Sequence, residues 1–429
     1  MEHRTIQNFE ALAENELRLN ALSLALAGYA AIDTAAALVR ELRIEDDKLH
    51  IGEQVHELGD RRVFFVGIGK CAIAGARAIE QILGDRLTSG IALDVSLDTT
   101  RPLSKIEAYV GTHPLPTEVN EQATKRIVEL LTECTENDLV LMLISGGGST
   151  LLCLHQAPMT CLDESSLFTE LSARGAKIQE INMVRKHTSL VRGGGLAKAS
   201  YPAEVVSLII SDVPGNDIGF ISSGPTVLDT STIADAQAVL DRYKLTTPVT
   251  FVETPKEAKY FERVTNTLFL TNQHALRAMQ AEATERGYTA TIMTDTMTGE
   301  ARSLGHDIAT ALHTLPAKTI LLYGGESTVT LGTHPGIGGR NQEMALSALK
   351  EIGDDELLLP LASDGRDNSD HAGAIADSTT LAHAHDRNLS VDEYLDAHRS
   401  YDFFKTTKDA LLVGYTESNV SDFIIAIKN

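Results

Sequence analysis

The chain of 429 residues has no tryptophan, and aromatic residues make up only 5% of it. Its cores must therefore be built from Leu, Ile, Val and Ala. Basic residues are also in deficit, because 37 Lys and Arg face 59 Asp and Glu and give a formal net charge of −22. Nucleic acids and anionic membranes require a basic protein face, so this charge argues against both as partners. It does not exclude small anionic ligands, whose binding depends on local basic residues.

Long apolar runs and cysteine motifs are missing as well. No segment approaches the ~20 apolar residues of a membrane-spanning helix, and the first residues carry acids where a signal peptide has an apolar core. Cys71, Cys134, Cys153 and Cys161 show no C-x-x-C spacing and no His at zinc-finger intervals. We therefore expect a cytoplasmic protein with reduced thiols. Cys71 follows a glycine turn, and we expect a packed residue there rather than a reactive thiol.

The length favours two domains. Residues 6–43 have helical periodicity with a break near Asp33. Short apolar strands then follow, each ending in glycine and leading into a helix. Strands such as LVLMLI are apolar on both faces, as parallel sheets require. We expect an α/β fold whose N-terminal domain, residues 1–250, is a Rossmann-like, doubly wound α/β/α sandwich.

The second domain is expected at residues 251–429. The boundary lies in residues 243–265, which combine two prolines with many charges. Beyond this segment several strands are adjacent instead of alternating with helices. This pattern predicts a smaller α/β domain with a mixed sheet.

One stretch, residues 321–346, reads LLYGGESTVTLGTHPGIGGRNQEMAL. It predicts a buried strand, a Gly-Gly-Glu turn, and a glycine-rich loop that leads into a helix. Crowded backbone N–H groups, a helix N-terminus and a guanidinium all favour an anionic ligand. The candidate binding residues here are Gly325, Glu326, Gly339, Arg340 and Asn341.

Two further glycine loops follow apolar strands, GIGK at 67–70 and SGGGST at 145–150. The first has neither the third glycine of a dinucleotide fingerprint nor the Ser or Thr of a Walker loop, and a tight turn explains it as well. The second predicts an anion-binding nest, with a flexible turn as the alternative. The candidate residues are Gly67, Gly69, Lys70, Ser145, Gly146, Gly147, Gly148 and Ser149.

Basic residues stand out in the segment NMVRKH, which precedes the RGGG sequence at 192–195. Arg185 and Lys186 fit either a ligand site or a solvated helix face. Gly193 and Gly194 make a third candidate nest for an anion.

Two aspartates directly follow buried strands, Asp212 in SDVPG and Asp364 in SDGRD. Ligands bind at the carboxyl ends of strands in this architecture, so both are candidates for holding Mg²⁺, and Asp212 also for acting as a base towards a hydroxyl. Capping of the turn, as an Asx-turn at Asp364, is the alternative. With neither a Ser-His-Asp pattern nor a His cluster, the inventory is typical of phosphoryl transfer.

These motifs, in this order, resemble those of the glycerate 2-kinases with a C-terminal MOFRL domain, some of which carry a hydroxypyruvate reductase label. The resemblance spans nearly the whole chain and rests on GIGKCA, THPLPTE, SGGGSTLL, INMVRKHTSLVRGGGLA, SDVPGNDIGFISSGPTVLD, GGESTVTL, GGRNQE and SDGRDNSDHAGA.

The resemblance implies ATP-dependent, Mg²⁺-assisted phosphorylation of D-glycerate at its 2-hydroxyl, giving 2-phosphoglycerate and ADP. It also implies an active site in the cleft between two α/β domains. Lys70, Arg340 and Asp212 become the catalytic candidates, and Asp364 and Asp212 the metal candidates. A homodimer is compatible with the sequence.

The chain departs from the family pattern at several positions, including Thr117, Arg192 and Asn368. Near the C-terminus, GYTESNV at 414–420 stands where the family has a loop like GPTGTNV; Asn419 is retained as a candidate binding residue. The alternatives are a kinase for a related 2-hydroxy acid, a hydroxypyruvate reductase using NAD(P)H, and a non-catalytic sensor of a phosphorylated metabolite. The reductase would need a dinucleotide fingerprint that GIGKCA lacks.

Overall fold

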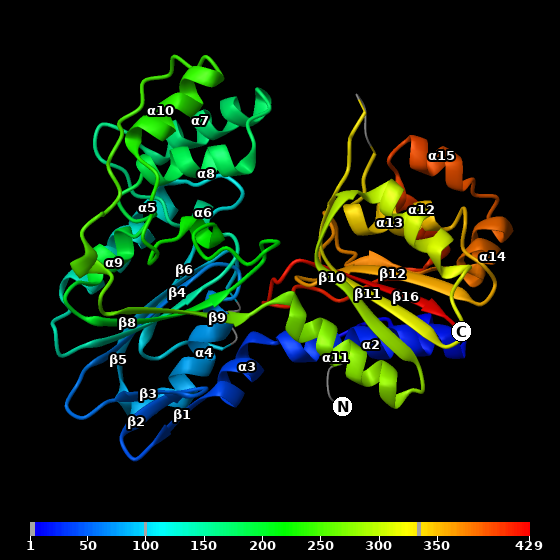
Figure 1. Ribbon diagram of the computed structural model, residues 1–429, viewed down its shortest axis with the longest axis horizontal. Coiled ribbons are helices and arrows are strands. Elements are labelled where there is room, and N and C mark those ends of the chain that lie inside the picture. Colours follow the sequence, from blue (N-terminus) through cyan, green and yellow to red (C-terminus); the bar gives the residue numbers. More distant parts are fainter. Residues whose placement is uncertain (1–4, 98–100, 333–335) are drawn as a thin grey trace. The chain divides into compact units, whose positions relative to one another are not determined.

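The computed structural model describes residues 5–97, 101–332 and 336–429. The chain divides into two compact units. The first, here called the parallel-sheet unit, comprises residues 34–212 and 216–270. The second, the mixed-sheet unit, comprises residues 1–33, 213–215 and 271–429. Figure 1 shows both, with most of their helices and strands labelled.

The parallel-sheet unit is built on a six-stranded sheet in the order β6-β5-β4-β7-β8-β9, and every neighbouring pair in it is parallel. Strands β4 and β7 are buried along their whole length, as their apolar sequences require. Figure 1 shows α4 on one face of the sheet and α5 with α9 on the other. This arrangement confirms the doubly wound fold, since right-handed crossovers that reverse direction place their helices on opposite faces.

The strands of this sheet are β4 (Val63–Ile68), β5 (Leu87–Asp94), β6 (Ile106–Val110), β7 (Leu139–Ile144), β8 (Glu204–Ile210) and β9 (Val264–Leu270). A small antiparallel sheet comprises β1 (Leu42–Glu45), β2 (Lys48–Ile51) and β3 (Gln54–Glu57). The helices are α3 (Thr34–Glu41), α4 (Ala72–Leu83), α5 (Glu118–Thr132), α6 (Gly148–Leu151), α7 (Cys161–Ala173), α8 (Ile178–His187), α9 (Gly195–Ser200) and α10 (Ile233–Arg242), with 3-10 turns η1 (Gly84–Arg86), η2 (Ile221–Ser223) and η3 (Ala258–Tyr260).

The mixed-sheet unit has strands in the order β10-β11-β16-β12-β13-β15, with β14 paired to β12. Strand β16 lies between β11 and β12 and runs antiparallel to both, whereas β10 and β11 are parallel. The mixed sheet expected for the second domain is thereby confirmed. Buried residues from α12, α13, α16 and the sheet form one continuous core in this unit.

Its strands are β10 (Thr289–Glu300), β11 (Thr319–Thr328), β12 (Glu356–Ala362), β13 (Gly373–Ala374), β14 (Ala376–Asp377), β15 (Ala410–Leu411) and β16 (Asp422–Lys428). Its helices are α1 (Phe9–Leu12), α2 (Glu16–Ile32), α11 (Asn272–Glu285), α12 (Ala301–Leu312), α13 (Arg340–Ala348), α14 (Ser378–Asp386), α15 (Val391–Asp396) and α16 (Ser400–Thr407).

The units do not follow the boundary expected at residue 250. Strand β9 lies beyond it yet pairs in parallel with β8, so the first sheet ends only at Leu270. Residues 1–33 belong with residues 271–429, because α2 packs on α11, β12 and β16. The break between helices near Asp33 is as expected, and it coincides with the passage of the chain from one unit to the other.

Two of the cysteines are joined, contrary to the expectation of four reduced thiols. Cys153 and Cys161 form a disulfide with their Cα atoms 6.1 Å apart, a separation typical of such bonds. No cysteine motif predicts this pair, because the two residues meet only through the turn that precedes α7. Cys71 and Cys134 are free and buried.

In the described ranges no single helix is long and apolar enough to cross a membrane. Only α2 and α3 taken together, a pair bent by 55°, reach that length and composition.

Candidate active site

Two of the predicted loops meet at the carboxyl ends of β4 and β7, which are neighbours in the parallel sheet. The backbone N–H of Lys70 donates to the carbonyl of Gly146 at 3.0 Å, and that of Ser145 donates to Ile68 at 2.9 Å. Gly69 has φ +114°, and a Cβ there would lie 2.2 Å from the Ser145 hydroxyl. Only glycine allows the two loops to approach so closely.

The loop after β7 has the form of an anion nest. Gly147 adopts the left-handed conformation, with φ +86°. Within the described residues, no acceptor is found for the N–H groups of Gly146, Gly147 and Ser149. Successive N–H groups that converge without an acceptor are the feature that binds phosphate or carboxylate oxygens.

Cationic and imidazole side chains flank this nest. A Cβ on Gly147 would lie 3.4 Å from Cγ of Lys70 and 3.7 Å from the ring of His113. Burial lowers the pKa of His113, and the charges of Lys70 and Arg185 lower it further. The surroundings of the nest are therefore positive, although the chain as a whole is acidic. We call Lys70, His113 and residues 145–149 the Lys70 cluster.

A chain of hydroxyls joins the nest to two other predicted motifs. The hydroxyls of Ser149 and Ser223 are 2.9 Å apart, and Ser223 donates to the side-chain oxygen of Asn182 at 2.5 Å. Ser222 donates to the carbonyl of Ser145 at 2.7 Å. The SSGPT segment therefore contacts the nest directly, and α8 is linked to it through Ser223.

The basic pair on α8 is held by acidic residues. Arg185 lies 3.2 Å from Glu164 and stacks over the ring of Phe168 at 4.2 Å. Burial lowers the pKa of Arg185 to about 10, against the opposing effect of Glu164. Lys186 binds Asp229 at 3.1 Å. The Arg185 and Lys186 side chains do not lie on a solvated helix face, since they are only 8% and 13% exposed.

The third candidate nest has its N–H groups engaged. Gly193 donates to the carbonyl of Ser223 at 2.9 Å, and Gly194 donates to that of Gly224 at 2.8 Å. A Cβ on either glycine would lie 2.7 Å from a neighbouring side chain. The geometry therefore favours a packed turn over an anion site at these two positions.

Asp212 follows β8, which adjoins β7, and so lies at the same edge of the sheet as Lys70. Burial raises the pKa of Cys71 to about 12, and the charges of Asp94 and Asp212 add to this effect. Asp212 is therefore close to the turn that carries Lys70. The Cys71 thiol stays protonated at neutral pH, as expected for a packed residue.

In the mixed-sheet unit, Arg340 is clamped between two carboxylates. Its Nε and Nη2 donate to Asp422 at 2.5 and 3.2 Å, and Nη2 also donates to Glu326 at 2.7 Å. Nη1 has no acceptor among the described residues, and the side chain is 34% exposed. One edge of the guanidinium is therefore held rigidly while the other can reach a ligand. Arg340, Glu326, Asp364, Asp367 and Asp422 are here called the Arg340 cluster.

Sequence reasoning missed Asp422. It begins β16 and pairs in register with Gly325 on one side and Ala362 on the other. Because β16 is antiparallel to both neighbours, its first residue lies at the edge where β11 and β12 end. No glycine loop or basic segment marks this position in the sequence, so a functional residue at the start of a strand is not evident there.

The N-terminus of α13 already holds a carboxylate of the protein. Asp367 accepts the N–H groups of Asn341 at 3.1 Å and Gln342 at 2.8 Å. A Cβ on Gly339 would lie 2.1 Å from the Asp367 carboxyl carbon, so glycine is required there. The helix N-terminus predicted to bind a ligand is thus capped internally. Part of the preceding glycine-rich loop, residues 333–335, lies outside the described residues.

The carboxylates of this cluster carry raised pKa values. Burial and the charge of Asp422 raise the pKa of Asp367 to about 6. Burial likewise raises the pKa of Asp422 to about 6, against the attraction of Arg340. For Arg340, burial lowers the pKa, but Asp422 and Glu326 outweigh it and the net shift is upward. Negative charge exceeds positive charge in this cluster.

Asp364 and Asn419 lie beside the same edge. Asp364 accepts the N–H of Arg366 at 3.1 Å, the Asx-turn considered as its structural role. Asn419 accepts the Ser363 hydroxyl at 3.4 Å. Tyr29 of α2 is fully buried here: its pKa is raised by burial and by the charges of Asp364 and Asp422. Gly325 has φ +142° at its close approach to Met297 of β10.

Two groups of three or more potential metal-ligating side chains occur in the part of the chain that the structure describes. They are Cys153, His155 and Cys161, and Glu14, His383 and Asp409. Neither includes Asp212 or Asp364. Each of these aspartates can offer a single carboxylate, which is how Mg²⁺ is commonly held when phosphate oxygens supply the other ligands.

Comparison with known proteins identifies the family. Residues 20–254 match a domain of unknown function (DUF4147), and residues 319–422 match the MOFRL family. A glycerate 2-kinase from Pyrococcus horikoshii is 36% identical over 432 residues, which cover 95% of this chain and 96% of that protein. The chain belongs to the glycerate 2-kinase family with a C-terminal MOFRL domain. It is a phosphotransferase with an alcohol group as acceptor.

Other members of the family show how far the likeness extends. The structure of a Thermotoga maritima glycerate kinase has a TM-score of 0.82 at 31% identity and covers 96% of this chain and 99% of that one. An Agrobacterium vitis protein that carries a hydroxypyruvate reductase name is 38% identical, over 88% of this chain and 90% of that one. Both kinds of name thus occur in the glycerate 2-kinase family.

Proposed function

We propose that this kinase phosphorylates D-glycerate at its 2-hydroxyl with ATP and yields 2-phosphoglycerate and ADP. The observation that carries the proposal is the Lys70 cluster at the ends of β4 and β7, in which N–H groups of the nest that have no acceptor among the described residues lie beside the Lys70 side chain. Such a site suits phosphate groups or the carboxylate of the acid. Relatives named glycerate 2-kinase support the choice of acid.

In this reaction the 2-hydroxyl oxygen forms a bond to the γ-phosphorus, and the bond from that phosphorus to the β-bridging oxygen breaks. ADP leaves with the electron pair of the broken bond. Asp212 orients the hydroxyl and takes its proton. Lys70, Arg340 or both bind the oxygens of the transferring group and offset their developing charge. The nest at 145–149 binds either nucleotide phosphates or the carboxylate.

The residues present also fit Mg²⁺. The Arg340 cluster has more carboxylates than cations, and burial has raised the pKa values of two of them, so a divalent cation would relieve its excess charge. Asp364 would hold the ion, with Asp212 as the alternative. Bound Mg²⁺ would neutralise phosphate charge during transfer.

The activity is tested by measuring ADP release with D-glycerate, L-glycerate, lactate and other 2-hydroxy acids. We expect the highest kcat/KM with D-glycerate. A clear preference for another 2-hydroxy acid would make that acid the substrate in place of D-glycerate. This outcome needs testing because the loop at 414–420 departs from the family pattern. If none of the acids supports ATP turnover while a phosphorylated metabolite binds, the protein is a sensor and the proposal fails.

The position of phosphorylation is tested by adding enolase to the reaction without phosphoglycerate mutase. 2-Phosphoglycerate is dehydrated to phosphoenolpyruvate under these conditions, whereas 3-phosphoglycerate is not. Absence of phosphoenolpyruvate from a reaction that releases ADP would overturn the 2-hydroxyl assignment.

The reductase alternative is tested with NADH, NADPH and hydroxypyruvate. We expect no oxidation of either cofactor, because the turn after β4 lacks the glycine pattern of dinucleotide sites. Turnover would contradict this expectation. A cytoplasmic location, the absence of nucleic-acid and membrane partners, and a homodimer remain predictions from sequence.

A further inference from the structure

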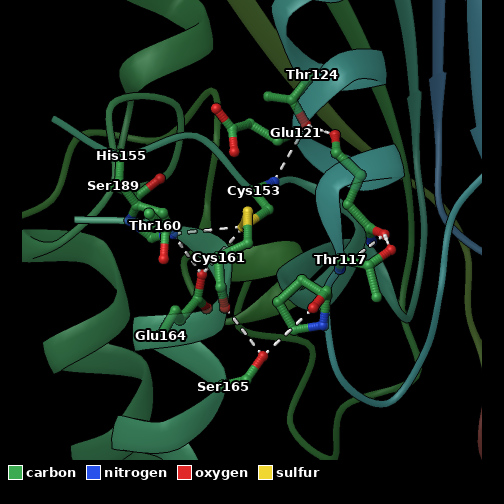
Figure 2. The surroundings of a disulfide bond; sticks show 12 residues. Thr117, Glu121, Thr124, Cys153, His155, Thr160, Cys161, Glu164, Ser165 and Ser189 are labelled. Atoms are coloured by element: carbon green, nitrogen blue, oxygen red, sulfur yellow. Dashed lines mark hydrogen bonds and ion pairs between the residues drawn. A yellow bond between two sulfur atoms is a disulfide. The ribbon is translucent and has the colours of Figure 1, made fainter. Parts of the chain in front are cut away.

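The disulfide between Cys153 and Cys161 lies against two further side chains with metal-binding atoms. Nε2 of His155 is 3.4 Å from Sγ of Cys153, and an oxygen of Glu164 is 3.6 Å from the same sulfur. The donor atoms of the two cysteines and His155 all lie within 4.8 Å of one another. Figure 2 shows the four side chains converging on one point. None of them belongs to the Lys70 or Arg340 cluster.

Their places in the chain explain the convergence. Cys161 and Glu164 are three residues apart at the start of α7, so their side chains share one face of that helix. Cys153 and His155 come from the segment that follows α6. The Thr160 capping box fixes the start of α7 and thereby the position of Cys161.

His155 is oriented as in protein metal sites. Its Nδ1 lies 2.5 Å from the carbonyl oxygen of Thr188, to which it can only donate. The proton is therefore on Nδ1, and Nε2 is the nitrogen directed at the sulfurs and Glu164. A backbone carbonyl that fixes the tautomer in this way is the usual companion of a metal-binding imidazole.

Two of the separations match those of a tetrahedral zinc site. With metal–ligand bonds of about 2.0–2.3 Å, the ligand atoms stand roughly 3.4–3.8 Å apart. The distances from Sγ of Cys153 to His155 and Glu164, 3.4 and 3.6 Å, already fall in this range. His155 and Glu164 are closer, at 2.9 Å, so metal binding would have to move these two groups apart.

Burial and charge complete the site. The side chains of His155 and Glu164 are 1% and 2% exposed, and both cysteines are buried. Glu164 forms ion pairs with Arg185 and Arg192, and in the described structure Nε and Nη1 of Arg192 are buried without an acceptor. Positive charge is in surplus, so thiolates would be stabilised here. Zn²⁺ with two thiolates adds no net charge.

We propose that the reduced form of this cluster is a structural Zn²⁺ site with Cys153, His155, Cys161 and Glu164 as its ligands. A dithiol reductant supplies two electrons that cleave the S–S bond, yields two cysteine thiols and leaves as its own disulfide. Zn²⁺ then binds as both thiols release their protons to the solvent. The segment between Cys153 and Cys161 is thus cross-linked by the disulfide in the oxidised protein and by Zn²⁺ in the reduced protein.

The full-length protein is tested after anaerobic reduction, by titration with Co²⁺ and Zn²⁺. We expect one equivalent of Co²⁺ to give the intense near-ultraviolet band of thiolate ligation and the visible bands of tetrahedral geometry, and Zn²⁺ to displace it. The oxidised protein should give neither. Zn²⁺ should also raise the melting temperature of the reduced protein. These readouts are independent of kinase activity.

Three variants test two of the proposed ligands and the specificity of binding. Cys161→Ser and His155→Gln should weaken Co²⁺ binding by about 100-fold or more. Loss of a residue that only hydrogen-bonds to a metal ligand already weakens binding by about 10–100-fold, and loss of the ligand itself should cost at least as much. Cys134→Ser, which removes a buried cysteine outside the cluster, should bind as wild type does. If Cys161→Ser fails to fold, His155→Gln provides the same test with both cysteines present. Reduced, folded protein without the thiolate band, or unchanged binding in His155→Gln, would overturn the proposal.

Discussion

The Lys70 cluster and the Arg340 cluster differ in the sign of their excess charge. Around Lys70 the protein offers backbone N–H groups without acceptors and a histidine whose pKa is lowered by burial and by nearby cations. Around Arg340 the helix N-terminus is already capped by Asp367, and the guanidinium is bound by Asp422 and Glu326. The first cluster is prepared for an anion. The second holds one cation within an excess of carboxylates.

This difference shows that a glycine-rich loop before a helix does not by itself make an anion site. Both clusters have the loop. At the start of α13 the N–H groups of Asn341 and Gln342 already bind Asp367, whereas in the described residues no acceptor is found for those of Gly146, Gly147 and Ser149. An anionic ligand can bind these N–H groups only where a carboxylate of the protein does not already accept their hydrogen bonds. Substitutions that alter one cluster should therefore have consequences of a different kind from those that alter the other.

The largest effect is expected from removing the cations. Lys70→Ala and Arg340→Ala should each lower kcat about 100-fold or more, since each removes charge stabilisation of the transferring group. Arg340→Ala should in addition lower the free energy of unfolding by about 2–3 kcal/mol, because buried Asp422 loses its partner. Steady-state kinetics and urea unfolding measure the two effects.

The control is Lys125→Ala, which removes an exposed lysine on α5 that pairs with Glu121. It should leave both quantities unchanged. Normal activity in Lys70→Ala or Arg340→Ala would exclude that residue from the site.

A smaller effect is expected from loosening the clamp on Arg340. Asp422→Asn should lower kcat about tenfold with little change in KM, because the guanidinium loses the partner that fixes its orientation. Glu326→Gln should have less effect, since Glu326 is 40% exposed while Asp422 is 3% exposed. Equal losses in the two variants would show that position within the clamp is unimportant.

The pH dependence of stability tests the buried carboxylates. Asp367 has a pKa of about 6 in the folded protein, above the value of about 3.9 in an unfolded chain. Between these values the native state binds more protons than the unfolded state. The contribution of Asp367 to stability is therefore full below about pH 4 and is lost as the pH rises through about 6.

Asp367→Asn should remove this loss, which we expect to be about 1–2 kcal/mol. Urea unfolding at pH 4.5 and pH 7 is the measurement. The wild type should lose more stability than the variant between these values, and parallel behaviour of the two proteins would contradict the raised pKa.

The smallest effect concerns the nest itself. Gly147 and Gly175 have nearly the same backbone conformation, with φ +86° and +80°, but a Cβ on Gly175 meets nothing within 4 Å. Replacing either with Ala should cost about 1 kcal/mol of stability from backbone strain. Only Gly147→Ala should raise KM, by several-fold, because its methyl group would crowd the N–H groups beside Lys70. A KM effect of equal size in Gly175→Ala would remove the nest from the ligand site.

Sequence patterns predicted the sheets and the loops of this protein well. Strands β4 and β7 are apolar throughout, and parallel order brings the loops after them to one edge of the sheet, so Lys70 and residues 145–149 could be found together. The same reasoning placed Arg340 at the start of α13. These successes rest on local periodicity and on a topology with few alternatives.

What escaped depends on contacts between distant segments. Asp422 precedes its strand, and its importance follows from the antiparallel register of β16. The cap formed by Asp367 on α13 joins residues about 26 apart in sequence, and no local signal chooses between a cap and a ligand site. The compact units differ from the boundary expected at 250, because proline and charge mark a surface segment, while pairing of β9 with β8 carries the sheet on to Leu270.

The composition of the mixed-sheet unit has a consequence for biosynthesis. Helix α2 contributes buried residues such as Leu22, Leu24 and Tyr29, and the elements it packs on, α11, β12 and β16, lie beyond residue 270. A ribosome therefore makes this apolar helix before its partners, with the whole parallel-sheet unit made in between. That unit can fold while the chain is still growing, whereas α2 must wait, with its apolar surface uncovered, until residues 271–429 have been made.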